Sequence, residues 1–234
     1  MRARTSFIVV FGLAVVLGAC GSSTKTGKTT TSTSATSVTT TTVATQALRA
    51  RMLDASDVGA FWKVGNPLNP MDLSSFAQIP CPNITVDPAV AKRLTAVTGV
   101  QFEPRDNSYK HMIEMAVTGE PGQLNSDVQR FIDAMNACAA SVASTSTTSG
   151  TGTVTGTKLP IPALGDQRAA WVGYMTESPG SQARWYSRNG VVRVGSTTIG
   201  LGLTEILSTP QDKPRFSNEE FVRILKTAVD KISS

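Results

Sequence analysis

The chain has a single histidine, His111, and no sequence motif of the kind that binds nucleotide phosphates or dinucleotides. A Ser-His-Asp or Cys-His catalytic set would therefore have to use this one residue. His111 falls in a segment of alternating apolar residues, where a packed, hydrogen-bonded histidine is the more frequent role. One histidine and two cysteines that we expect to be bridged are also too few ligands for zinc. We therefore expect neither an enzyme nor a metal site, and no cofactor.

Other features of catalytic and nucleic-acid-binding proteins are also missing. Four carboxylates lie near expected strands, but their spacing does not bring two of them to the separation that glycosidases use. We interpret these four as residues of solvated faces: Glu114, Asp166, Glu177 and Glu205. The net charge is +5, and the basic residues are scattered rather than clustered. This distribution argues against a nucleic-acid partner.

Long apolar runs are absent too. The longest, Phe7 to Leu17, has 11 apolar or glycine residues, whereas a transmembrane helix needs about 20. Basic residues precede this run and small residues follow it, which is the layout of a secretory signal peptide over residues 1–19. The segment Leu17–Cys20 resembles the bacterial lipobox, whose cysteine receives a diacylglyceryl group. A plain signal peptide with an incidental cysteine is the alternative. We expect Cys20 to be lipidated.

The residues after Cys20 indicate a tether. Residues 22–45 contain 17 Ser or Thr and almost nothing to bury, a composition typical of disordered segments. We therefore expect residues 20–45 to be a lipidated cysteine followed by a disordered stalk. Acyl chains stabilise membrane attachment by about 0.8 kcal/mol per buried methylene. The stalk would then hold residues 46–234 at the extracytoplasmic face of the cell membrane, with the lipid on Cys20 as the membrane contact.

Two cysteines remain for the folded part, Cys81 and Cys138. An even number in an exported chain indicates one disulfide bond. Two buried free thiols are the alternative.

The pattern of residues 46–234 predicts a single α+β domain. We expect a mostly antiparallel sheet with the helices packed on one face. A short helix is predicted over 47–59, and a second one follows Pro88. Residues 109–117 alternate as a strand, with His111 on the apolar face and Glu114 on the other. Ser126 and Gln129 form a capping box for a long helix that carries Cys138 on its apolar stripe. Residues 144–157 are either a mobile loop or an edge strand.

The last third of the chain predicts strands and a final helix. The strands are expected over 168–177, 183–190 and 191–200, with a hairpin turn at Asn189-Gly190. Ser217 and Glu220 cap the final helix. The strand aromatics and a neighbouring arginine indicate a tentative ligand cleft, with core packing as the alternative: Trp171, Tyr174, Arg184 and Trp185.

Four segments together resemble the PknH-like extracellular sensor domain family: "MLDASDVGAFW", "MNACAASV", "LPIPALGDQRAAW" and "RNGVVRVGSTT". This family occurs on mycobacterial Ser/Thr kinases and on stand-alone lipoproteins. The resemblance covers roughly residues 46–233. It implies an α+β domain with a cleft for a ligand, and a bridge between Cys81 and Cys138. It also implies a second disulfide, for which this chain lacks the cysteines.

We therefore expect a non-catalytic, ligand-binding lipoprotein of the mycobacterial cell envelope, whose partner is an envelope ligand or a protein. An envelope lipid carrier or assembly factor is the alternative, and it would need an apolar cavity of several hundred Å³. A structural or antigenic surface module is a third reading.

Overall fold

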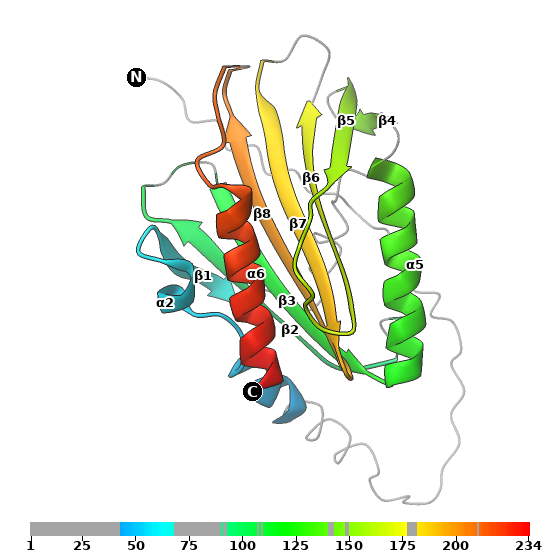
Figure 1. Cartoon of the computed structure of the whole chain (residues 1–234). Coiled ribbons are helices and arrows are strands. Elements are labelled where there is room, and N and C mark those ends of the chain that lie inside the picture. The colour runs from blue at the N-terminus through cyan, green and yellow to red at the C-terminus, as the bar shows by residue number, and fades with distance from the viewer. Residues whose placement is uncertain are drawn as a thin grey trace, which may run out of the picture. The chain divides into compact units, whose positions relative to one another are not determined.

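Within the residues that the structure describes, eight strands form one antiparallel sheet in the order β1-β2-β3-β8-β7-β6-β5-β4 (Figure 1). This computed structural model describes residues 43–67, 90, 93–106, 108, 110–139, 143–147, 150–176, 182–209 and 211–234. The strands are β1 Trp62–Pro67, β2 Leu94–Pro104, β3 Lys110–Gly119, β4 Ala143–Thr147, β5 Gly150–Lys158, β6 Gln167–Thr176, β7 Arg184–Val194 and β8 Thr197–Leu207. The helices are α2 Ala55–Val58, α5 Pro121–Ala139 and α6 Asn218–Ser233, and residues 43–49 are also helical. The expected α+β class and antiparallel sheet are confirmed.

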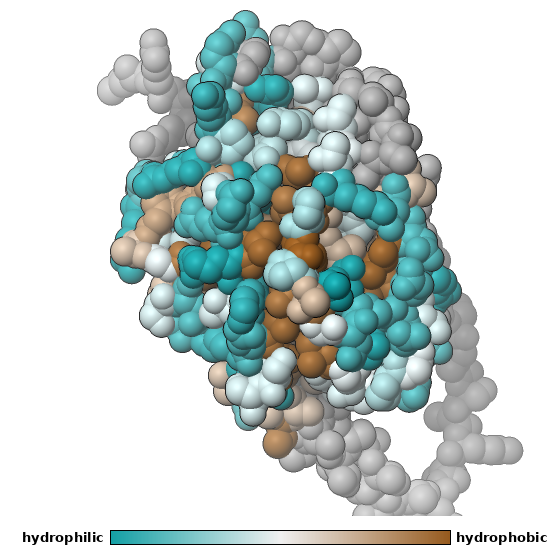
Figure 2. Space-filling model, in the orientation of Figure 1, coloured by the Kyte–Doolittle hydropathy of each residue, from teal (hydrophilic) through white to brown (hydrophobic). Residues whose placement is uncertain are grey.

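The two long helices pack on opposite faces of the sheet, so the expectation that all helices share one face is wrong. In β7, Val192 belongs to the core under α6, whereas Val191 packs with residues of α5. Neighbouring strand residues point to opposite faces, so β7 contributes to two cores. Figure 2 shows apolar side chains at the centre of the face that carries α6, with hydrophilic residues around them. An amphipathic helix pattern requires a packing surface but does not say which face supplies it.

Strand β3 is confirmed, but the sequence pattern assigned its core face incorrectly. The residues that are fully buried under α6 are Met112, Glu114 and Ala116. His111 lies on the opposite face and is half-buried. The alternation of apolar residues was real, but it marked the less buried side of the strand.

The predicted turn at Asn189-Gly190 is wrong, because β7 runs straight through both residues. The hairpin between β7 and β8 turns instead at Gly195, whose φ is +57°. Gly190 has a packing role: a Cβ there would lie 2.8 Å from Leu225 Cδ2 of α6. The glycine therefore allows the helix to approach the strand closely.

The starts of two helices also differ from prediction. Helix α5 begins at Pro121, and the carboxylate of Glu120 accepts hydrogen bonds from the main-chain N–H groups of Gly122 (3.1 Å) and Gln123 (2.7 Å). Ser126, the predicted cap, donates instead to Gly122 O. The helix predicted over 47–59 is split, because Asp54 and Asp57 form a capping box that starts α2.

Two other predictions for the folded part are confirmed. At the start of α6, Ser217 Oγ accepts the hydrogen bond of Glu220 N at 3.1 Å. Residues 144–157 fall within β4 and β5, which agrees with the edge-strand alternative.

Several predictions lie outside the described residues: the signal peptide, Cys20, the stalk up to residue 42, the loop with Cys81, the helix after Pro88, and Glu177. Cys138 lies within α5, but its partner is not described, so the disulfide stays a prediction. Among the described helices, none has both the length and the apolar character needed to cross a membrane.

The glycines of two turns make a matched pair for a stability test. A Cβ at Gly165 (φ +58°) would lie 2.3 Å from Arg193 O, whereas a Cβ at Gly195 (φ +57°) would meet nothing within 4 Å. We expect Gly195→Ala to lower the free energy of unfolding by about 1 kcal/mol, the usual cost of a left-handed alanine. Gly165→Ala should cost at least about 1 kcal/mol more, because main chain must also move. Urea denaturation measures both, and equal losses would contradict the close approach.

Candidate functional site

Trp171 fixes helix α5 against strand β6. Its side chain is buried, and its Nε1 donates a hydrogen bond to Asn136 Oδ1 at 3.3 Å. The ring of Phe131 meets the Trp171 ring edge-on, with 6.1 Å between centroids. An indole nitrogen only donates, so the Asn136 oxygen faces Trp171 and the amide nitrogen faces away from it. Trp171 is therefore a packing residue of the α5 interface.

Strand β5 separates from β6 next to this interface. The two strands pair from Thr153 opposite Thr176 to Lys158 opposite Trp171. One further main-chain bond follows, from Leu159 N to Ala170 O at 2.8 Å. Pro160 and Pro162 come next, and proline has no N–H to contribute to a strand pair. The first residues of β6 therefore have a neighbouring strand only on the β7 side.

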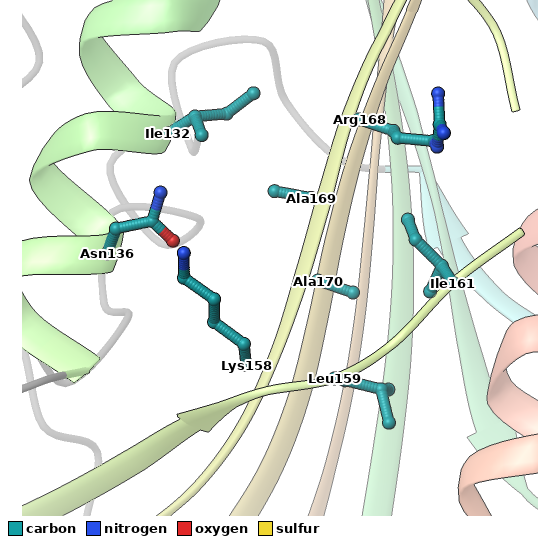
Figure 3. Close-up of a pocket in the computed structure, with 8 residues that line it drawn as sticks. All are labelled: Ile132, Asn136, Lys158, Leu159, Ile161, Arg168, Ala169 and Ala170. Atoms are coloured by element: carbon teal, nitrogen blue, oxygen red, sulfur yellow. The ribbon is translucent and has the colours of Figure 1, made fainter. Parts of the chain in front are cut away.

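The separation leaves a pocket of about 220 Å³ (Figure 3). Helix α5, the end of β5, the segment after it and the start of β6 all contribute to its lining: Ile132, Asn136, Lys158, Leu159, Ile161, Arg168, Ala169 and Ala170. In Figure 3, Lys158 and Asn136 point toward each other on the α5 side of β6, and Arg168 lies near Ile161 on the other side. The walls are mostly apolar, with polar groups at both sides.

The charge of the pocket is positive. Lys158 and Arg168 are both exposed, and neither forms an ion pair with another described residue. The lining has no acidic residue. An uncompensated positive lining favours a ligand with negative charge.

The four residues of the expected cleft do not line a common surface. Tyr174 and Arg184 do come together, with the guanidinium carbon 5.1 Å from the ring centroid. The strand registers place them on the α6 face of the sheet, whereas Trp171 and Trp185 lie on the α5 face. The pocket itself was missed by the sequence reasoning. The signal for it was the pair of prolines directly after Lys158.

A buried ion pair on the α6 face was also missed. Arg188 and Glu205 are 2% and 0% exposed, which overturns the interpretation of Glu205 as a solvated residue. Arg188 Nη1 donates to Glu205 Oε2 and Arg188 Nε to Asn218 Oδ1, both at 3.0 Å. The remaining carboxylate oxygen accepts from Arg215 N at 2.8 Å. The pair therefore fixes the start of α6 to the sheet.

Glu114 is a second carboxylate that proved to be buried. Its Oε2 accepts a hydrogen bond from Leu53 N at 2.8 Å, and its Oε1 has no partner among the described residues. Burial raises the pKa of Glu114 to about 7. Glu114 lies opposite Leu201, four positions from Glu205 along β8, a separation of about 13 Å at strand spacing. The two carboxylates are therefore not placed as a catalytic pair.

Of the remaining predicted positions, Asp166 is exposed, as expected. His111 lies opposite Thr204, and burial lowers its pKa. In the described part of the chain, no group of His, Cys, Asp and Glu residues is arranged to hold a metal ion.

No family model and no curated protein matches this chain. The structure is similar to the crystal structure of the extracellular domain of PknH from Mycobacterium tuberculosis. The identity is 15% and the TM-score 0.56, over 81% of this chain and 96% of that chain. Two weaker likenesses are a putative uncharacterized protein from Mycobacterium smegmatis (15%, TM-score 0.40, 75% and 91%) and the human StarD13 lipid transfer and protein localization domain (12%, 0.23, 70% and 98%). The predicted resemblance to the PknH-like sensor domain is thus confirmed for the fold.

The buried carboxyl of Glu114 makes stability depend on pH. Its pKa is about 7 in the folded chain against an ordinary value of 4.5, so the folded state holds the proton more tightly. Stability is therefore lost as pH rises from 4.5 to 7, by up to about 1.4 kcal/mol per pH unit. We expect Glu114→Gln to remove this slope and to be more stable than the parent at pH 8, by about 1–3 kcal/mol. Urea midpoints from pH 4 to 8 measure it. The partly exposed Glu103→Gln is the control, and an unchanged slope in Glu114→Gln would contradict the assignment.

Proposed function

We propose that this chain is a lipid-anchored, extracytoplasmic protein whose folded domain binds a ligand in the pocket between α5 and the start of β6. The observation that carries the proposal is the fold shared with an extracellular domain over nearly its whole length. The Leu17–Cys20 segment, with the apolar run before it, supports export and lipidation.

The stalk explains how an anchored domain would reach its ligand. A flexible chain of the length of residues 22–45 spans about 27 Å on average and at most about 80 Å. The domain would therefore remain near the membrane while sampling a layer several nanometres deep. Envelope molecules within this layer are the candidate partners.

Binding without catalysis agrees with the chemistry of the described residues. Glu114 and Glu205 lie far apart on the sheet, and Arg188 neutralises Glu205. The pocket offers cations and an amide rather than a nucleophile with a base. These groups are suited to holding a ligand in place.

The size of the pocket favours a small ligand or one part of a larger ligand. Its volume of about 220 Å³ is below the roughly 300–1,000 Å³ of typical small-molecule sites. A lipid carrier would need a larger apolar cavity, so this pocket gives that alternative no support.

The anchor is tested by replacing the acylated sulfur. We expect the parent chain to incorporate a palmitate analogue and to fractionate with membranes, and Cys20→Ala to lose both properties. Ser23→Ala is the matched control, because it changes a neighbouring small residue and keeps the thiol. Labelling and membrane association of Cys20→Ala at parental levels would contradict the proposed anchoring.

A further inference from the structure

The outer edge of β6 offers unpaired main-chain groups at the pocket. In an antiparallel strand, alternate residues direct their N–H and C=O groups to the same neighbour. Leu159 N donates to Ala170 O, so Ala170 faces the outer edge, and Arg168 faces it too. Within the described ranges, no main-chain group bonds to Arg168 from this side. The edge therefore carries a donor and an acceptor that a further strand would pair.

The pocket extends along both faces of the sheet at this edge. Ala169 packs toward α5, where Ile132 also lies, whereas Ala170 belongs to the core on the α6 side. Figure 3 shows Ile161 on the same side as Arg168 and Ala170. Such a space accommodates a chain whose side chains alternate between two faces, which is the property of an extended strand.

The two cations also lie on opposite faces. Lys158 is paired with Trp171, whose side chain points to α5, whereas Arg168 has the same orientation as Ala170. A compact inorganic anion would reach only one of them directly. Two acidic side chains at adjacent positions of an added strand would point to opposite faces, one toward each cation.

We propose that this site binds an acidic peptide in extended conformation, which pairs with Gln167–Ala170 as an added strand. The inference rests on the proposed ligand-binding function and names the ligand class for that pocket. The free edge spans about 10 Å, so three or four peptide residues would pair with it. Main-chain hydrogen bonds provide affinity that is largely independent of sequence, and the acidic positions provide selectivity.

The test uses two peptides of identical composition and the chain carrying Cys20→Ala, which prevents acylation. In the probe, acetyl-Thr-Val-Glu-Asp-Val-Thr-amide, the acids are adjacent; in the control, acetyl-Thr-Val-Glu-Val-Asp-Thr-amide, both acids face one side. We expect the probe to bind more tightly, by about threefold to tenfold, the range of one or two exposed charge pairs. The amide resonances of Arg168 and Ala170 should shift during the titration.

Charge reversal separates the pocket from general electrostatics. Lys158→Glu with Arg168→Glu should weaken binding of the probe by at least about tenfold, because attraction becomes repulsion. The matched control is Arg51→Glu with Lys213→Glu, which makes the same change in net charge at two exposed residues outside the pocket lining. This control should bind like the parent.

Two further ligands distinguish failure of the peptide proposal from failure of the proposed function. Equal binding of both peptides, shifts away from β6, or no peptide binding would overturn the peptide proposal. If phosphatidylglycerol vesicles or envelope glycans bind instead, and binding depends on Lys158 and Arg168, the ligand-binding function stands without the peptide. If none of these ligands binds, both proposals are wrong.

Discussion

Pro160 and Pro162 have no N–H to donate, so β5 cannot continue its pairing with β6 beyond Leu159. The chain leaves the sheet at this point, and the edge of β6 beside it stays open. Helix α5 lies next to the gap because Trp171 holds it there through Asn136. The pocket, its two uncompensated cations and the unpaired main-chain groups of Arg168 all follow from this exit of the chain.

The rest of the domain keeps that edge in a fixed position. Strand β7 supports cores on both faces, and the buried pair of Arg188 and Glu205 ties the start of α6 to the sheet. Removing one member of such a pair costs about 3–5 kcal/mol, because the other charge remains buried. A rigid sheet with one open edge is a suitable support for binding, because binding groups held by strands lose little freedom when a ligand arrives.

The sequence predicted those elements whose signals are local. The stripe and cap of α6, the antiparallel strands and the α+β class all followed from periodicity and turn chemistry. The core face of β3 did not, because a carboxylate at position 114 indicates solvent, whereas the fold buries it against Leu53 N. Gly190 resembled a turn residue although its role is to admit α6. The pocket was missed because it depends on where α5 packs, and helix periodicity alone does not give the face.

Hydrogen exchange of single amides in β6 tests the open edge most directly. Ala169 directs its N–H toward β7, where Val191 is its partner, whereas Arg168 directs its N–H outward. The account predicts that the Arg168 amide exchanges at nearly the rate of an unprotected amide, while the Ala169 amide is strongly protected. Equal protection of the two amides in the ligand-free chain would show that another segment already pairs with this edge, and would contradict the account.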